Sequence, residues 1–291
     1  FPVCIGEKGI LQVNIMLGKL PDIIAELGGG SVSNAVPDYA YAVIWDEKTD
    51  VSTTDEYRGI KLERLDAKRI KIHASGKGAH AAKPEQGINA IGVLANYLNE
   101  KVLPDSDKKP FVFLSQACGE YFGRTLGIDR VSEAFQYLTC IGGRLCVSDG
   151  IMIQNFNIRY IPDTTYKPVF EKIKKTLTPQ GFAAQLVMSS EGYLIPASDD
   201  RVMALTNACE EVLGYECRPY TMGGGTYARW LANTVAFGAT LQSERGKFGE
   251  GRGDAHQRDE YISSAELKKT ILIYILSIMN LSESYKKKLN Q

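Results

Sequence analysis

The sequence predicts an α/β protein of two domains, in which an α+β module interrupts an outer domain. Three observations predict this class: an alternating strand near the N-terminus, two strand–helix units in the middle, and longer helical patterns towards the C-terminus. A stretch rich in glycine and proline follows the first strand and marks a change of domain. We therefore expect residues 1–18 and 197–291 to form the outer α/β domain, and residues 19–196 to form the inserted module.

The first strand is predicted by the segment "ILQVNIML", in which Leu11, Val13, Ile15 and Leu17 share one face. In the module, "RIKIHASGKGAH" is typical of a strand, and the helix after it has an apolar face of Ile91, Leu94, Ala95 and Leu98. A second unit follows. Its strand has an apolar face of Phe156, Ile158 and Tyr160 and a polar face of Asn155, Asn157 and Arg159. The helix after it has an apolar stripe of Val169, Phe170, Ile173 and Leu177. The segment "GFAAQLVM" then predicts another strand. The two units suggest a duplicated, ferredoxin-like α+β element.

Two longer helices are predicted in the outer domain. One is lined by Val202, Leu205, Cys209 and Val212, and the last by Leu267, Ile271, Ile275 and Ile278. Ser263 and Glu266 have the spacing of a capping box, which predicts that the last helix begins next to Ser263.

The composition narrows the class of protein. The chain has 291 residues, 44% of them hydrophobic, and 34 basic side chains balance 34 acidic ones, so nothing indicates a nucleic-acid surface. Six cysteines without a C-x-x-C pair indicate reduced thiols and a cytoplasmic protein. The longest apolar stretch is shorter than the roughly 20 residues of a membrane span. We expect a small-molecule or peptide partner, no nucleic acid and no membrane.

Several polar residues are candidates for chemistry, each with an alternative. His80 lies in a glycine-flanked turn, where it could bond the backbone or donate to an oxyanion. Arg159, on the polar strand face, could form a salt bridge within the sheet or grip a carboxylate. The glycines before Thr226 allow a close approach of the backbone, either to a ligand or to a packed helix; they are Gly223, Gly224 and Gly225.

His256 is a candidate metal ligand whose partners are not evident. Asp259 and Glu260 follow it closely, but residues adjacent in sequence point apart, and a zinc site needs three or four ligands that converge. The remaining histidine, His73, alternates with Ile70 and Ile72 on a strand, which favours a surface position.

Taken together, several motifs resemble one enzyme family. These are "FPVCIGEKG", "GGGSVSNAVPDYA", "GKGAHAAKPEQGINAI", "NIRYIPD", "GGGTYAR" and "DAHQRDEYI". Their order and separations are similar to those of dipeptidase V-type enzymes, within the zinc-dependent aminoacylase, carnosinase and carboxypeptidase superfamily. The resemblance extends from residue 1 to about residue 280.

The resemblance implies a two-domain metallopeptidase that cleaves dipeptides or short peptides. An α/β catalytic domain would hold two bridged zinc ions, and the inserted domain would be a lid whose duplication imitates a dimer partner, so that the protein is a monomer. His256 matches a zinc ligand, His80 the lid histidine that stabilises the oxyanion, and Arg159 the clamp for the substrate carboxylate. The loop Gly223, Gly224, Gly225 and Thr226 matches one whose backbone contacts the substrate, and Asn34 matches a lid-side substrate contact.

The family's other zinc ligands and its general-base glutamate precede the position of "FPVCIGEKG", and this sequence does not contain them. In the complete enzyme the resemblance implies attack by zinc-activated water. The chain alone is expected to be inactive, because one histidine cannot hold zinc tightly. Two alternatives stay open: a non-catalytic fragment or pseudoenzyme that serves binding or oligomerisation, and a deacylase of N-acyl amino acids.

Overall fold

A computed structural model describes residues 1–49, 51, 57–241, 248–249, 252–253 and 258–289. The chain forms two compact units. The inserted unit is Lys8–Gly192, and the outer unit combines Phe1–Glu7 with Tyr193–Gln291. The boundaries expected from the sequence lie after residues 18 and 196. The strand predicted over residues 10–17 is hydrogen-bonded along its length to strands of the inserted unit.

The inserted unit is built on an eight-stranded sheet of order β13-β2-β12-β11-β3-β5-β7-β6, with every neighbouring pair antiparallel. Its strands are β2 (Gly9–Lys19), β3 (Ile24–Gly29), β5 (Tyr39–Trp45), β6 (Ile60–Arg64), β7 (Arg69–Ser75), β11 (Thr139–Ser148), β12 (Ile151–Tyr160) and β13 (Ala183–Ser190). Two short ladders complete it: β4 (Ala35–Val36) with β8 (Ala79–His80), and β9 (Val131–Ser132) with β10 (Gln136–Tyr137).

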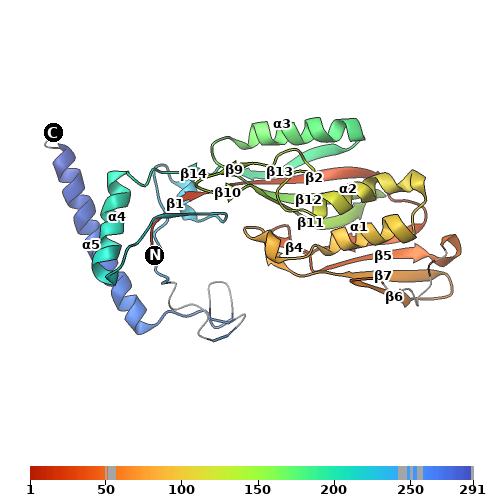
Figure 1. Ribbon diagram of the computed structural model, residues 1–291, viewed down its shortest axis with the longest axis horizontal. Coiled ribbons are helices and arrows are strands. Elements are labelled where there is room, and N and C mark those ends of the chain that lie inside the picture. Colours follow the sequence, from red (N-terminus) through yellow and green to blue (C-terminus); the bar gives the residue numbers. More distant parts are fainter. Residues whose placement is uncertain (50, 52–56, 242–247, 250–251, 254–257, 290–291) are drawn as a thin grey trace. The chain divides into compact units, whose positions relative to one another are not determined.

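Helices cover one face of this sheet (Figure 1). They are α1 (Ala90–Lys101), α2 (Lys108–Cys118) and α3 (Tyr166–Leu177), with single 3-10 turns at Asp46–Lys48, Pro84–Gln86, Asp105–Asp107 and Thr178–Gln180. Asn89 caps α1 by accepting a hydrogen bond from the Ile91 N–H, at 2.9 Å. The apolar side chains of helices and strands merge into one core, which explains why the sheet is buried on this side.

In β2 and β12 the residues predicted to form the apolar face are buried. The residues predicted to form the polar face of β12 are only partly exposed. Leu11, Val13 and Ile15 of β2 are fully buried, as are Phe156 and Ile158 of β12. The opposite face of β12 is half-buried as far as Asn155, but Asn157 and Arg159 are also buried. One end of the sheet is therefore covered on both faces.

The sheet consists of two halves of four strands. β11 and β3 meet at its centre, where one register pair, Leu145 with Gly29, joins them. On one side lie β13, β2, β12 and β11, and on the other β3, β5, β7 and β6. The order of elements along the chain differs between the halves. In the first half the helix α3 separates β12 from β13, whereas in the second half the described residues between β3, β5, β6 and β7 contain no α-helix.

The outer unit contains a small mixed sheet of order β14-β1-β15. Its elements are β1 (Cys4–Glu7), β14 (Tyr193–Leu194), β15 (Tyr220–Met222), α4 (Asp200–Leu213), a 3-10 turn η5 (Tyr227–Trp230) and α5 (Ser264–Leu289). The Ser263 Oγ accepts a hydrogen bond from the Glu266 N–H, as the predicted cap requires. In a complete capping box the Glu266 carboxylate would accept from the Ser263 N–H, but here it accepts from the Leu241 N–H.

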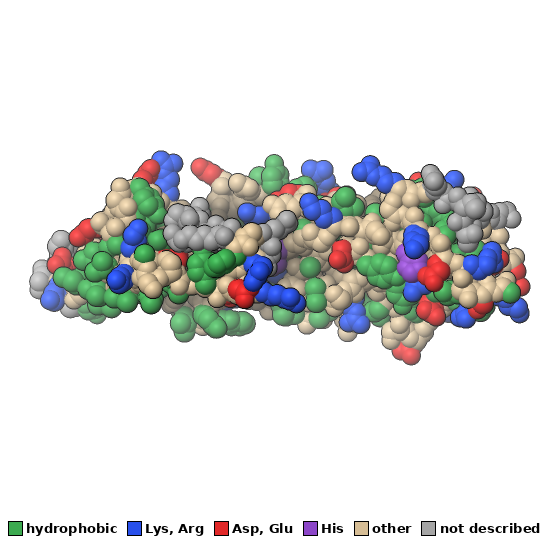
Figure 2. All heavy atoms as spheres, turned by 90° about the horizontal axis from the view of Figure 1, so that it is seen from below, with side chains coloured by type: hydrophobic (Ala, Val, Ile, Leu, Met, Phe, Trp, Pro, Cys, Tyr) green, Lys and Arg blue, Asp and Glu red, His purple; other side chains and the backbone are tan. Residues whose placement is uncertain are grey.

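The last helix exposes the stripe that the sequence predicted as its apolar face (Figure 2). Leu267, Ile271, Ile275 and Ile278 are between 46% and 69% exposed, whereas Glu266, Thr270, Ile273 and Ser277 are buried. Periodicity identifies an apolar face but not the element that covers it. Among the described helices, none combines the length and apolarity needed to cross a membrane.

Candidate functional site

Arg159 lies near the end of β12, in register with Ile10 of β2 and Thr139 of β11. Its residue surface is 6% exposed. The Nε atom donates a hydrogen bond of 2.9 Å to the Oδ1 atom of Asn157, two residues earlier on the same strand face. A guanidinium is positively charged and can only donate hydrogen bonds, so it is a group that can bind a carboxylate.

Three of the predicted site residues gather here. The Thr139 hydroxyl, beside Arg159 in the ladder, donates a hydrogen bond of 2.9 Å to the carbonyl of Ala81. Ala81 follows His80, and its N–H donates to the Asn34 carbonyl at 3.0 Å. Because β4 pairs with β8, Ala35 and His80 are register partners. The structure therefore brings Asn34, His80 and Arg159 into one neighbourhood of the inserted unit.

His80 is exposed, and its ring is oriented by its own loop. The Nδ1 atom accepts a hydrogen bond of 3.1 Å from the Ala82 N–H. An imidazole nitrogen that accepts cannot carry the proton of the neutral ring, so that proton is on Nε2. Neutral His80 is consequently an Nε2–H donor, which is the tautomer that oxyanion stabilisation requires.

Lys8 is a further cation of this region that the sequence interpretation missed. It is 5% exposed, and its Nζ atom donates to the Tyr137 carbonyl. Burial lowers the pKa of Lys8 to about 8; the nearby Glu85 opposes this decrease and the positive charge of Arg159 adds to it. The segment "GEKG" does not indicate that Lys8 is buried, because a single lysine at the start of a strand is usually exposed to solvent.

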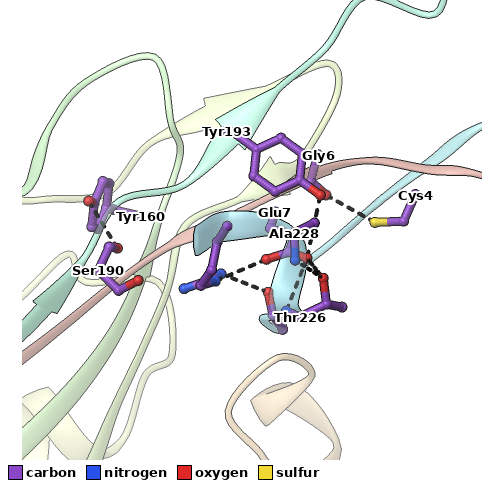
Figure 3. Close-up of polar contacts among 10 residues, drawn as sticks. Cys4, Gly6, Glu7, Tyr160, Ser190, Tyr193, Thr226 and Ala228 are labelled. Carbon is purple, nitrogen blue, oxygen red and sulfur yellow. Dashed lines mark hydrogen bonds and ion pairs between the residues drawn. The ribbon is translucent and has the colours of Figure 1, made fainter. Parts of the chain in front are cut away.

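In the outer unit the glycine-rich loop is fixed by a buried carboxylate, that of Glu7 (Figure 3). Glu7 accepts a hydrogen bond from the Thr226 hydroxyl and one of 3.0 Å from the Thr226 N–H. Its other oxygen pairs with Arg229 Nε at 3.0 Å, and the two side chains are 0% and 4% exposed. A Cβ on Gly225 would lie 2.7 Å from the Arg229 guanidinium, so this glycine permits a close approach to a side chain.

The pKa values of two groups near Glu7, the Tyr193 phenol and the Cys4 thiol, are raised. Burial, followed by the charge of Glu7, raises the pKa of the Tyr193 phenol, whose hydroxyl lies 3.5 Å from the carboxylate. Burial likewise raises the pKa of the Cys4 thiol to about 11. Both groups are therefore neutral at physiological pH.

A family model, that of peptidase family M20/M25/M40, matches residues 3–280. The chain belongs to this family. The protein of Bacillus subtilis named "Putative dipeptidase YtjP" is 29% identical over 301 residues, covering 97% of this chain and 62% of its own length. A Staphylococcus epidermidis protein named "Putative dipeptidase" is 26% identical, with 96% and 61% covered. The chain thus spans less than two thirds of the length of these M20/M25/M40 relatives.

Solved structures of similar fold include the aminoacylhistidine dipeptidase of Vibrio alginolyticus, with a TM-score of 0.43, 11% identity, and 82% of this chain and 57% of that chain covered. Another is an M20 family metallo-carboxypeptidase, Sso-CP2, of Sulfolobus solfataricus, with a TM-score of 0.42, 16% identity, and 96% and 60% covered. Similarities of this size carry no residue roles to this chain.

The metal ligand expected for an M20/M25/M40 peptidase, His256, lies outside the described residues. Of its sequence neighbours, Asp259 pairs with Arg252 at 2.5 Å, and both side chains are exposed. Within the described part of the chain, no three His, Cys, Asp or Glu side chains are grouped so that they could hold a metal ion. His73 lies on the sheet between Tyr39 and Glu63, away from the residues around Arg159.

Proposed function

We propose that the complete protein hydrolyses dipeptides or other short peptides, and that this chain supplies the groups that hold the substrate. The observation that carries the proposal is the gathering of Asn34, His80 and Arg159 around Ala81 and Thr139. These residues come from three separate stretches of the sequence. Membership of the M20/M25/M40 peptidase family supports the same reaction class.

Each residue of the proposed site would contact a different part of the substrate. Arg159 would bind the carboxylate terminus of the peptide, which selects short substrates by length. His80 would donate its Nε2–H to the oxyanion that forms at the scissile carbonyl. Asn34 and the loop Gly223, Gly224, Gly225 and Thr226 would contact the substrate through polar and backbone groups.

We also propose that the inserted unit is the lid and the outer unit part of the catalytic domain. A lid of two α+β halves is supported by the division of the sheet at the Leu145–Gly29 pair, although only one half has a helix between its strands. A duplicated lid would make the protein a monomer. Six free cysteines are compatible with the proposed cytoplasmic location.

Zinc, two ions per complete protein, is part of the proposal. Among the described residues no group of side chains fits a zinc site. His256 would be the contribution of this chain, and the other ligands would belong to the part of the complete protein that lies outside it.

The test compares this chain with the protein encoded by the uninterrupted reading frame, using elemental analysis after dialysis and a panel of dipeptides and N-acyl amino acids. We expect about two zinc ions and dipeptide hydrolysis in the longer protein, and neither in this chain. Hydrolysis of N-acyl amino acids alone would favour a deacylase, and a longer protein without activity would favour a pseudoenzyme. About two zinc ions on this chain would contradict the proposal that the other zinc ligands lie outside it.

Two substitutions in the active longer protein test the roles. His80→Ala should lower kcat about 10²- to 10³-fold with a small change in KM, because an oxyanion donor acts in the transition state. Arg159→Met should raise KM for free dipeptides and leave the hydrolysis of C-terminally amidated ones unchanged. Equal effects of Arg159→Met on both substrate forms would contradict the carboxylate clamp.

A further inference from the structure

The eight-stranded sheet of the inserted unit contains a groove at its centre, where the two halves meet. β3 and β11 are neighbours in the sheet, but their ladder consists of one register pair, Leu145 with Gly29. By contrast, the ladder between β11 and β12 extends from Thr139 to Ser148. The facing edges of β3 and β11 therefore separate beyond this single pair.

The groove is large enough for a small ligand and is lined by both strands. Its volume is about 460 Å³, within the range of about 300–1,000 Å³ that is usual for ligand sites. Glu26 and Gly28 of β3, Tyr41 of β5, and Arg144 and Cys146 of β11 line it. A Cβ on Gly28 would lie 3.0 Å from the Tyr41 ring, so this ring packs directly on the backbone of β3.

The groove carries two charges of opposite sign. Glu26 and Arg144 are both exposed, and within the described part of the chain neither side chain forms an ion pair or a hydrogen bond. Because Gly29 faces Leu145, Glu26 and Arg144 are four residues apart in register, which corresponds to roughly 13 Å along the strands. A molecule that contacts both charges must therefore be longer than a single amino acid.

We propose that this groove binds a short peptide with free ends. The α-ammonium group of the peptide pairs with Glu26, and its α-carboxylate accepts hydrogen bonds from the guanidinium of Arg144. In this orientation the peptide runs parallel to β3 and antiparallel to β11. Its N–H and C=O groups then face the separated strand edges, as in the addition of an extended peptide to a sheet.

This groove lies apart from the residues around Arg159. Thr139, the register partner of Arg159, precedes Arg144 by five residues on β11, which corresponds to roughly 15 Å. A peptide in the groove therefore occupies a second site of the inserted unit. Binding there does not depend on the proposed hydrolysis.

Cys146 provides a reporter for the groove. Its side chain is partly exposed and lines the groove, whereas the other five cysteines are buried. Iodoacetamide should alkylate Cys146 first in the folded chain, because a thiol must be accessible in order to react. The experiment measures the alkylation rate of each cysteine by mass spectrometry, in the 291-residue chain, as the concentration of Ala-Ala-Ala is raised.

We expect Ala-Ala-Ala to protect Cys146 from alkylation and free alanine not to protect it. Glu26→Gln and Arg144→Gln should each raise the concentration for half-maximal protection by about tenfold, because each removes a charge-assisted contact. Acetylation of the peptide N-terminus should weaken protection of the wild type but not of Glu26→Gln. Amidation of the peptide C-terminus should do the same for the wild type and Arg144→Gln.

Two matched variants remove charges elsewhere in the inserted unit. Arg58→Gln and Glu133→Gln change exposed side chains that do not line the groove, and both should keep the wild-type protection. The buried cysteines report folding in the same experiment, because a variant that does not fold would react at all six thiols.

Every other result would overturn the inference. If Ala-Ala-Ala leaves the alkylation of Cys146 unchanged, the groove binds no peptide, and the function proposed for Arg159 and His80 is unaffected. Equal protection by free alanine, or by a peptide blocked at both ends, would contradict the assignment of the two charges. Loss of protection in His80→Ala would mean that the peptide covers Cys146 from the site around His80 and that the groove is not a second site.

Discussion

Lys8 is the residue whose ionisation most directly links the inserted unit to pH. Its pKa falls from 10.5 to about 8 in the folded chain. Between these values Lys8 binds more protons in the unfolded chain than in the folded one, so its own contribution to the free energy of unfolding should rise with pH from about 8 to 10.5, whereas buried thiols such as Cys4 contribute a decrease over the same range. Below pH 8 Lys8 is charged in both states and contributes no slope. The full rise corresponds to about 3 kcal/mol.

Urea unfolding at pH 7, 8, 9 and 10 checks this for the wild type and Lys8→Met. The free energy of unfolding of the wild type relative to Lys8→Met should rise with pH, and Lys83→Met, which removes an exposed lysine of the same unit, should follow the wild-type curve. Parallel curves for wild type and Lys8→Met would contradict the assignment. Sequence reasoning could not anticipate this lysine, because burial of its ammonium depends on strands and loops far away along the chain, such as Tyr137.

At the scale of elements, the Glu7–Arg229 ion pair joins β1 to the 3-10 turn η5 within the outer unit. Both side chains are almost fully buried, at 0% and 4% exposure. Glu7→Gln removes the carboxylate that pairs with the buried guanidinium of Arg229 and should cost about 3–5 kcal/mol of outer-unit stability. Glu216→Gln, in a pair whose side chains are both exposed, should leave the stability of the outer unit nearly unchanged. Trp230 fluorescence in a Trp45→Phe background follows this unit during urea unfolding.

The elements show what periodicity can and cannot predict. The helices α1, α3, α4 and α5 were predicted, as were the strands β2, β7, β12 and β13, because each has an apolar face with a clear period. Pairing over long sequence separations has no such signal. Glu7 and Thr226 meet although more than two hundred residues separate them, and the exposed stripe of α5 depends on which neighbour covers the helix. For the same reason Asn34, His80 and Arg159 were selected through the family resemblance and not through their spacing.

At the scale of the whole molecule, the two units differ in how much core each possesses. The largest core cluster lies entirely within the inserted unit, where it joins strands from both halves of the sheet to α1, α2 and α3. Among its described residues the outer unit has two small clusters, and its longest helix exposes Ile271, Ile275 and Ile278. Stability follows buried apolar area, so the inserted unit should be the more stable of the two.

Urea unfolding should therefore show two transitions. Trp230 reports the outer unit and should change at lower urea than Trp45, which reports the inserted unit; single Trp→Phe variants separate the signals. Ile72→Ala, at a fully buried position of the inserted unit, should shift only the Trp45 transition, by about 2–5 kcal/mol. The isolated segment 8–192 should retain the Trp45 transition at the same midpoint. Coincident transitions in the full chain would mean that the outer unit draws its stability from the inserted one, and an unfolded 8–192 segment would mean the reverse.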